Sequence, residues 1–237
     1  MVKIVVLVDD KSFDQRLKVA HGLSLYLEFN DIYLLFDLGP NSEILQYNVE
    51  KLGIDVELVD ATIISHIHST HIGGLSYIGW VSPYLKVYIP YDSMHSLGRM
   101  ARSNGLIPEE VIDWINPWPG IYISKPIHGP PWEHFLVIDT SRGLIVFSGC
   151  MHPGVDKVLD IITGYLDRNI YGVVGGFHLE NAPRSIIDKT IHVLFEKYCV
   201  EKIAPLHCSG ELFKRVINEN YPDRIIEAGA GSILDIG

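Results

Sequence analysis

The sequence predicts an α/β fold in which sheets are covered by helices on their outer faces. Hairpin-like pairs of strands come first, and strands then alternate with helices from His134 to the end of the chain. Hydrophobic residues make up 47% of the 237 residues and charged residues 20%, so the chain can bury a sizeable core. We therefore expect a single domain that spans residues 1–237.

The first part of the chain shows strand-like periods that are broken by turn residues. Residues 23–29 alternate apolar and polar side chains, as a half-buried strand does, and the polar residues at 30–31 supply a hairpin turn. Asn41 or Ser42 is suited to cap a helix that ends at Gly53. The expected elements are strands at 2–8, 23–29, 32–36 and 61–65, and a helix that starts at 41 or 42 and ends at 53.

The last part of the chain alternates more regularly between the two kinds of element. Apolar residues recur at helical spacing near 155–162 and 187–198, and the short apolar runs between them are typical of buried strands. Ser-Arg-Gly at 141–143 marks a hairpin. The expected elements are strands at 135–139, 144–148, 171–174 and 202–206, helices near 155–162, 187–198 and 211–218, and one or two strands between 225 and 236.

Residues 91–131 are expected to form an irregular insert, because prolines and glycines interrupt every period there. We predict short helices and a long loop. Such a segment either faces the substrate, as a lid does, or merely connects the two regular parts of the chain. Trp114, Trp118 and Trp132 could stack on a flat ring of a substrate or anchor the core, and the sequence leaves both open.

Composition excludes several classes of protein. Acidic residues outnumber basic ones by 29 to 19, and the formal charge of −10 argues against a nucleic-acid partner. Three cysteines do not make a disulfide framework and suit a reducing compartment. Residues 2–8 resemble a strand more than a signal peptide, and no apolar run reaches the ~18 residues of a membrane span. We expect a cytoplasmic protein without a membrane partner, and its oligomeric state stays open.

The strongest chemical signal is a cluster of histidines directly after the strand at 61–65. His66 and His68 are two residues apart and so point the same way, and His71 joins them once the chain turns into a helix. Imidazole is a common ligand of zinc and also suits iron, nickel and copper. The spacing therefore predicts a metal site at the end of this strand.

Three later histidines, His152, His178 and His207, each follow a predicted strand and lie close to a glycine. In α/β sheets the strand ends are where ligands bind, and here that position recurs. Any one of these histidines alone would fit a surface role. Together with the first cluster they predict that imidazoles from distant segments gather in one pocket.

The other five histidines have simpler interpretations. His95 lies in a polar stretch and His192 within a helix, so both are expected on the surface. His21 and His134 flank strands and fit either role. His128 could reach a substrate from the insert, but a surface position is the simpler expectation.

Several segments together resemble the metallo-β-lactamase superfamily. They are Gly22-Leu23-Ser24, Phe36-Asp37-Leu38-Gly39, Leu52-Gly53-Ile54-Asp55 and Ser65-His66-x-His68-x-x-His71-x-Gly73-Gly74. The Ser-Gly-Cys-x-His, Gly-Gly-Phe-His-Leu and His-Cys-Ser-Gly segments look like the branch of 7,8-dihydropterin-6-methyl-4-(β-D-ribofuranosyl)aminobenzene 5′-phosphate synthases, which is linked to methanopterin biosynthesis. The resemblance spans roughly residues 20–237. It implies an αββα sandwich with a metal site at one edge of two sheets.

The resemblance also implies one or two bound divalent metal ions, with zinc as the first expectation. His66 and His68, together with either His152 or His178, would hold a first ion. His71 and His207 would hold a second. The implied metal ligands are His66, His68, His71, His152, His207, Cys150 and His178. The implied catalytic residues are His66, His68, His71, His152 and His207.

Four other positions qualify this ligand set. Cys150 lies where many relatives have a metal-bridging aspartate, so it is either a thiolate ligand or a spectator, while Cys208 is expected to pack. Asp37 matches an aspartate that supports the ligands from behind. Thr70 replaces the aspartate of the superfamily motif, and its neutral hydroxyl is a poor metal ligand. The second ion therefore binds weakly, binds only with substrate, or is absent.

Three kinds of function remain open at this stage. The leading one is a metal-dependent enzyme that hydrolyses an ester of a small, phosphorylated metabolite or condenses a dihydropterin diphosphate with a ribofuranosylaminobenzene phosphate. The alternative is a degenerate metal-binding or structural member without catalysis, which Thr70 favours and the six strand-end histidines oppose. The third is redox chemistry at iron, which the missing aspartate opposes because di-iron sites use carboxylates.

Overall fold

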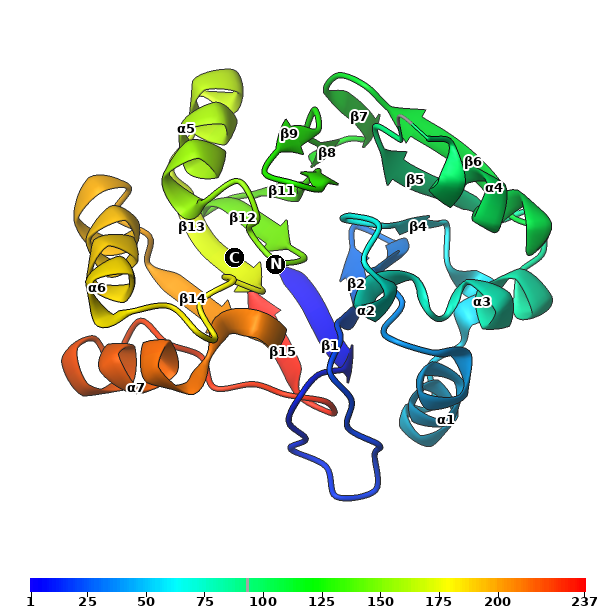
Figure 1. Ribbon diagram of the computed structural model, residues 1–237, viewed down its shortest axis with the longest axis horizontal. Helices are drawn as coiled ribbons and strands as arrows, with labels where there is room; N and C mark the ends of the chain where they lie inside the picture. The colour runs from blue at the N-terminus through cyan, green and yellow to red at the C-terminus, as the bar shows by residue number, and fades with distance from the viewer. Residues whose placement is uncertain (93) are drawn as a thin grey trace.

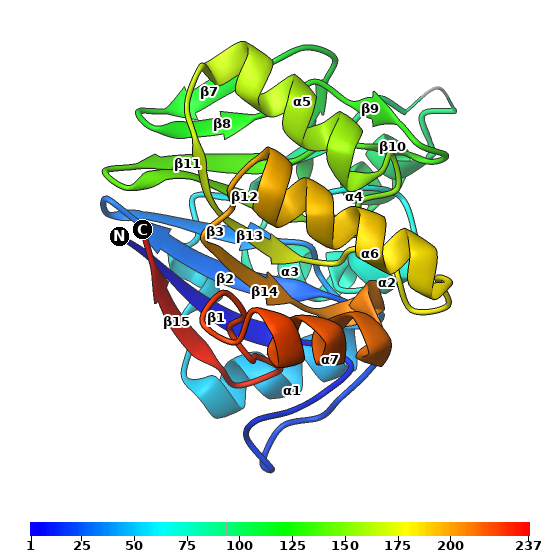
Figure 2. The ribbon, with the colours of Figure 1, turned by 90° about the vertical axis from the view of Figure 1, so that its left-hand side faces the viewer.

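The computed structural model describes residues 1–92 and 94–237 and shows two sheets packed face to face, with helices on both outer sides (Figure 1). The predicted arrangement of sheets beneath outer helices is confirmed. Figure 2 shows the second sheet and its helices from the side, with the two chain ends close together. None of the helices in the described ranges has the length and apolar character that a membrane crossing requires.

The first sheet has seven strands and combines an antiparallel part with a parallel part. Its spatial order is β15 (Ile233–Ile236), β1 (Val2–Val8), β2 (Ser24–Phe29), β3 (Ile32–Phe36), β4 (Ala61–Ile63), β5 (Lys86–Pro90) and β6 (Ile107–Val111). The parallel part, β3 to β6, brings the carboxyl ends of β3 and β4 to one edge of the sheet. The histidine cluster at 66–71 starts at that edge.

The second sheet has six strands, of which three are parallel. Its spatial order is β14 (Lys202–Pro205), β13 (Ile170–Gly175), β12 (Gly143–Ser148), β11 (Leu136–Thr140), β8 (Ile121–Ile123) and β7 (Ile115–Trp118). A separate small ribbon pairs β9 (Ile127–His128) with β10 (Trp132–Glu133). The carboxyl ends of β12, β13 and β14 therefore lie together, and each leads into one of the later histidines.

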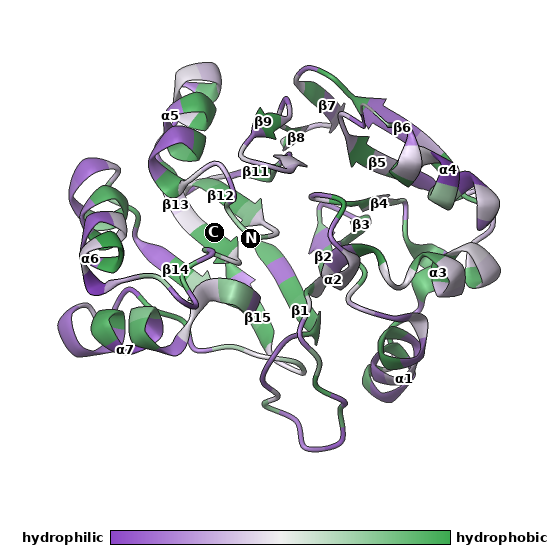
Figure 3. Cartoon of the chain, in the orientation of Figure 1, coloured by the Kyte–Doolittle hydropathy of each residue, from purple (hydrophilic) through white to green (hydrophobic). Residues whose placement is uncertain are grey.

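Helices cover the outer face of each sheet. Those of the first half are α1 (Ser42–Leu52), η1 (Val56–Leu58), α2 (Ser69–Ile72), α3 (Leu75–Val81) and α4 (Ser96–Ser103). Those of the second half are α5 (Val155–Leu166), α6 (Arg184–His192), its π-helical continuation η2 (Val193–Lys197), η3 (His207–Ser209) and α7 (Glu211–Asn220). In Figure 3 the strands between the helix layers are largely apolar, and the helices carry polar residues on their outer sides.

The core consists of one apolar layer between the sheets and one beneath each set of helices. Between the sheets, the rings of Phe36 and Phe147 lie 6.2 Å apart, centroid to centroid, and both side chains are fully buried. Helix α1 follows the predicted caps. The Asn41 side chain accepts a hydrogen bond from the Ile44 N–H, and Gly53 ends the helix in the left-handed conformation.

One expectation about the strands was wrong. Residues 23–29 were expected to be half-buried, but every side chain of β2 except that of Glu28 is buried. The reason is that both faces of β2 are covered. The second sheet covers one face, and on the other face side chains of β2 such as Tyr26 pack into the core beneath the helices. Of the one or two strands expected between 225 and 236, the structure has one, β15, and Ile225 adds only an isolated bridge to Ile203.

The predicted irregular insert at 91–131 is also wrong in its described residues. They form the short helix α4 and four strands: β6 extends the first sheet, β7 and β8 extend the second, and β9 belongs to the small ribbon. Pro108 in β6 and Pro117 in β7 fit because these two strands lie at sheet edges, where a missing N–H donor costs little. The segment is therefore the crossover between the two sheets and part of the framework.

Candidate metal centre

Six histidines come together where the parallel strands of both sheets end. They line or border a cavity of about 380 Å³, which also contains Cys150, Cys208 and Thr70. Their segments follow β4, β12, β13 and β14, and α2 contributes one of them. The histidines are His66, His68, His71, His152, His178 and His207. The structure thus places every histidine of the predicted set around one pocket.

Three ring nitrogens form a compact triangle. His66 Nε2 lies 3.0 Å from His68 Nδ1 and 3.3 Å from His152 Nε2. In a tetrahedral zinc site with Zn–N bonds of ~2.0–2.1 Å, neighbouring nitrogens are about 3.3 Å apart. His178 is not part of this triangle, because its ring stacks beside that of His152 and its nearest candidate partners are His152 and Cys150.

The buried carboxylate of Asp37 determines which ring nitrogen carries the proton in His66 and in His71. Asp37 Oδ2 accepts hydrogen bonds from the Ser65 hydroxyl and from His71 Nδ1, both at 2.7 Å. Because Ser65 donates to Asp37, its oxygen accepts from His66 Nδ1–H at 2.9 Å. Both His66 and His71 therefore direct an unprotonated Nε2 into the pocket. Asp37 acts from behind the imidazoles, as its position in the sequence motif predicts.

The nitrogen triangle fits a divalent cation. The unprotonated His66 Nε2 has one lone pair and can accept only one hydrogen bond, from either His68 or His152. The remaining short nitrogen–nitrogen contact therefore has no proton between its two atoms. Burial lowers the pKa of His66 and of His68 and lowers that of His152 to about 4, so all three imidazoles are neutral at neutral pH. Neutral imidazole nitrogen is the form that ligates metal.

The second half of the pocket contains the remaining predicted ligands. Cys150 Sγ lies 3.3 Å from His71 Nε2, and the rings of His71 and His207 are in edge contact with centroids 5.1 Å apart. Thr70 lines the same cavity, at the position where the superfamily motif has aspartate. The structure therefore brings Cys150, His71 and His207 together on the Thr70 side of the pocket.

Two aspartates that sequence reasoning missed hold His207. Asp10 accepts from His207 Nδ1 at 3.0 Å and from His21 Nδ1 at 2.8 Å, and Asp9 accepts from the His207 backbone N–H at 2.6 Å. Although burial opposes it, these histidine contacts lower the pKa of Asp10 to about 2. The sequence signal was available, since an Asp-Asp pair ends the first strand.

Glu133 is the other missed residue. Its carboxylate is fully buried and accepts hydrogen bonds from the backbone N–H groups of Cys150, Met151 and His152 at 2.8–3.1 Å. Burial raises the pKa of Glu133 to about 7, although the three hydrogen bonds oppose the shift. The carboxylate thus holds the loop that carries His152. An acidic residue at the start of the apolar run 135–138 was the available signal.

Backbone strain marks the same region. Asp37, Met151, His178 and His207 all adopt positive φ angles of 44–58°, which residues with a side chain rarely take up. Each of them lies beside or within the histidine pocket. Strained conformations of this kind persist where the surrounding structure enforces them, and they cluster at functional sites.

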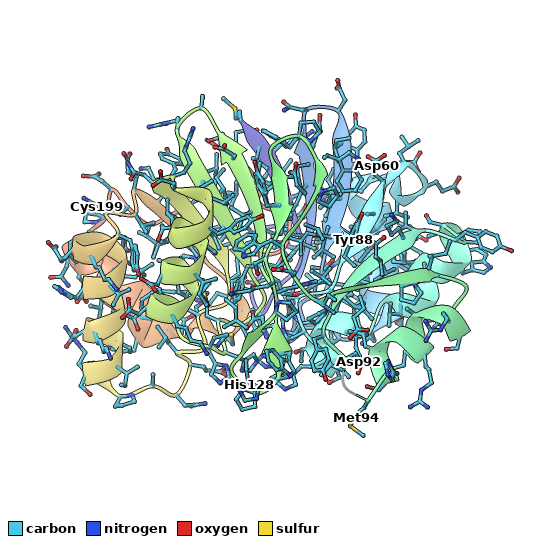
Figure 4. All side chains as sticks on the ribbon, turned by 90° about the horizontal axis from the view of Figure 1, so that it is seen from above. Asp60, Tyr88, Asp92, Met94, His128 and Cys199 are labelled. Atoms are coloured by element: carbon cyan, nitrogen blue, oxygen red, sulfur yellow. The ribbon has the colours of Figure 1, made fainter. Side chains whose placement is uncertain are left out.

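The five histidines outside the predicted set have varied environments. His95 and His192 are exposed, as predicted, and His128 is exposed beside Trp132. In Figure 4, His128 lies along the same edge of the molecule as Asp92 and Met94. His21 borders the pocket through its contact with Asp10, whereas His134 is fully buried in the framework.

Comparison with known proteins agrees with this geometry. No family model matches the chain. It is 26% identical to the 7,8-dihydropterin-6-methyl-4-(β-D-ribofuranosyl)-aminobenzene-5′-phosphate synthase of Methanocaldococcus jannaschii, over 98% of this chain and 96% of that one. A crystal structure of a metal-dependent hydrolase of the β-lactamase superfamily has a TM-score of 0.84 at 26% identity and covers 100% of this chain and 99% of its own.

The likeness in fold extends to a more distant structure. The metallo-β-lactamase fold protein YhfI from Bacillus subtilis has a TM-score of 0.73 at 13% identity, over 99% of this chain and 100% of that one. The two sheets and the outer helices are therefore parts of one known architecture. The protein is a metal-dependent enzyme with the metallo-β-lactamase fold, and it is similar along nearly its whole length to the archaeal synthase.

Proposed function

We propose that the protein acts on a phosphate or diphosphate ester of a small metabolite, with a zinc ion bound by His66, His68 and His152. The triangle of their nitrogens, with edges of 3.0 and 3.3 Å beside an open cavity, is the observation that carries this proposal. A divalent cation there supplies a Lewis acid that stabilises negative charge on a phosphoryl oxygen. Three protein ligands leave a coordination position open, as catalytic zinc sites do.

The specific reaction that we propose is the condensation of a dihydropterin diphosphate with a ribofuranosylaminobenzene phosphate. The amino nitrogen of one substrate bonds to the methylene carbon of the other, whose bond to the diphosphate oxygen breaks, and the amine releases one N–H proton to solvent. Support comes from the 26% identity to the archaeal synthase over 98% of this chain. Departure of diphosphate places charge where a cation and hydrogen-bond donors are most effective.

The chain's own residues orient the ligands and bind the substrate. Asp37 and Ser65 keep Nε2 of His66 unprotonated, and Asp10 accepts from Nδ1 of His207. No lysine or arginine lines the described part of the cavity. The charge of a bound phosphate must therefore be balanced by bound metal and by polar N–H groups such as the Asn181 amide.

Product analysis tests the reaction. Zinc-loaded protein incubated with both substrates should release diphosphate together with the condensed product. His68→Ala and His152→Ala should each abolish the reaction, because each removes one nitrogen of the triangle. His192→Ala alters an exposed histidine at the end of α6 and should match the unsubstituted chain.

Other product patterns would redirect the assignment. Diphosphate or phosphate released without condensed product would identify a hydrolase, which the likeness to the metal-dependent hydrolase supports as the second candidate. No turnover of either kind would indicate a degenerate member. Thr70→Asp then discriminates further, because a restored carboxylate at this position without any gain of activity would favour the degenerate alternative.

A further inference from the structure

Two buried thiols meet inside the histidine pocket. Cys150 Sγ, Cys208 Sγ and a ring nitrogen of His207 all lie within 4.8 Å of one another. All three residues are at least 94% buried. The thiols come from the segments that follow β12 and β14, so the fold brings together two cysteines that are far apart in the chain.

The backbone around the two thiols is arranged to let them approach. A Cβ atom on Gly176 would lie 2.2 Å from the Gly149 carbonyl oxygen and 2.8 Å from Cys208 Sγ, closer than real Cβ contacts allow, and 3.1 Å from the Cα of Cys150. Any side chain at position 176 would therefore displace the segments that carry the two thiols. The backbone N–H of His178 donates to Cys208 Sγ at 3.3 Å, the kind of contact that stabilises a sulfur carrying negative charge.

The charge balance of this half of the pocket requires an anionic ligand. Asp37 and Asp10 lie behind the imidazoles, where Nδ1 groups occupy their oxygens, and Thr70 is neutral. Glu180 lies exposed on the rim and belongs to none of the metal-ligand groups among the described residues. The sulfurs of Cys150 and Cys208 are thus the donors facing the interior that become anionic when they bind a metal ion.

We propose that Cys150, Cys208 and His207 form a second, thiolate-rich metal site, with His71 as its fourth ligand through the nitrogen that lies 3.3 Å from Cys150 Sγ. Two thiolates neutralise a divalent ion as the missing aspartate otherwise would. Soft sulfur ligands select zinc, cadmium or cobalt over magnesium or manganese. The inference rests on the proposed function only in that both ions share one pocket.

Cobalt loading tests the site directly. Full-length protein kept reduced, stripped of metal and titrated with Co²⁺ should bind two equivalents per chain, one in each half of the pocket. The second should produce the ultraviolet absorption of a cobalt–thiolate bond. Cys208→Ser and Cys150→Ser should each weaken that absorption, because one of the two thiolates remains, and should weaken binding of the second equivalent by about tenfold or more.

Cys199→Ser is the matched control, because Cys199 is exposed and lies at the outer side of the molecule beside the helices (Figure 4). It should bind cobalt like the unsubstituted chain. A thiolate band that is absent from the unsubstituted protein, or unchanged in Cys208→Ser, overturns the second site. Binding of one equivalent without a thiolate band would do so while leaving the proposed function intact, whereas no cobalt binding at all would remove both.

Discussion

At the scale of single residues, the histidines of the pocket are held by buried or half-buried carboxylates that lie behind them. Glu133 accepts hydrogen bonds from three backbone N–H groups of the loop at 150–152. Asp37 and Asp10 fix the rings of His71 and His207. Supporting groups of this kind commonly change metal affinity by 10–100-fold when they are replaced.

Glu133→Gln tests this support. The amide NH₂ of glutamine would face N–H donors where a carboxylate oxygen now accepts, so the loop that carries His152 should shift. We expect zinc affinity to fall by about 10–100-fold and the free energy of unfolding to fall by about 1–3 kcal/mol. Competition with a chelator and urea denaturation measure the two effects. Glu57→Gln, at an exposed glutamate, should change neither, and unchanged zinc affinity in Glu133→Gln would refute the assigned role.

His134 makes stability depend on pH. Burial lowers its pKa to about 3 from an ordinary value of 6.5, although the backbone of Ile64 opposes the shift, and neither ring nitrogen has a hydrogen-bond partner among the described residues. The unfolded chain binds a proton here below pH 6.5 and the folded chain does not, so stability is present above that pH and is lost as the pH falls toward 3.

We expect His134 alone to cost about 2 kcal/mol of unfolding free energy between about pH 7.5 and about pH 5. His134→Phe should remove that part of the pH dependence, because phenylalanine has a similar shape and no proton to bind. Urea titrations of metal-free protein at both pH values measure the difference. His192→Phe, at an exposed histidine, should retain the full dependence. If the unfolding free energy of His134→Phe fell between the two pH values as much as that of the unsubstituted chain, the prediction would be wrong.

At the scale of elements, the metal pocket requires close approach of β4 and β12 at their carboxyl ends. A Cβ atom on Gly149 would lie 2.0 Å from Ser65 Oγ and 3.0 Å from His66 Nδ1. Position 149 therefore has to be glycine if the chain of hydrogen bonds from Asp37 through Ser65 to His66 is to form.

Gly149→Ala should displace Ser65 and His66 and so lower both zinc affinity and the thermal unfolding midpoint. Gly164 in α5 is the matched control, because nothing lies within 4 Å of a Cβ built there. Gly164→Ala should raise stability by about 0.5–1 kcal/mol through its better helix propensity. Thermal scans and zinc titration of the two variants check both directions. A Gly149→Ala variant that binds zinc normally would show that the contact is not needed.

The elements also show which parts of the fold were predictable. Helix α1 matched its predicted caps because Asn41 and Gly53 act on their own neighbours. The segment 91–131 was missed because its strands lie at the edges of two different sheets. Edge strands are stabilised by one partner strand and tolerate proline, so their sequences show little of the alternation of apolar and polar residues that predicts a strand.

At the scale of the whole molecule, we propose that residues 1–237 form one domain. One of the three core layers joins side chains of both sheets, and β15 returns the end of the chain to pair with β1. Shared burial of this kind couples the two halves energetically, so neither half should be stable without the other.

Metal-free protein should therefore unfold in a single transition. Tryptophan fluorescence and far-ultraviolet circular dichroism should give the same urea midpoint and slope, since Trp118 in β7 reports on the core between the sheets, whereas circular dichroism reports on all helices and strands. Removing residues 233–237, which include β15, should lower that midpoint while the unfolding transition stays single. Two separate transitions would show that the sheets form independent units.

The sequence by itself determined the order of most strands and helices, the caps of α1 and the set of histidines that lies at strand ends, because periodicity, capping and turn chemistry act between near neighbours in the chain. Only the tertiary structure decided that His152 joins His66 and His68, that Asp10 and Glu133 support the ligands, and that two thiols share the pocket. The reason is distance along the chain. Contacts between residues 19 to 197 positions apart follow from how the strands and sheets pack, which no local pattern encodes.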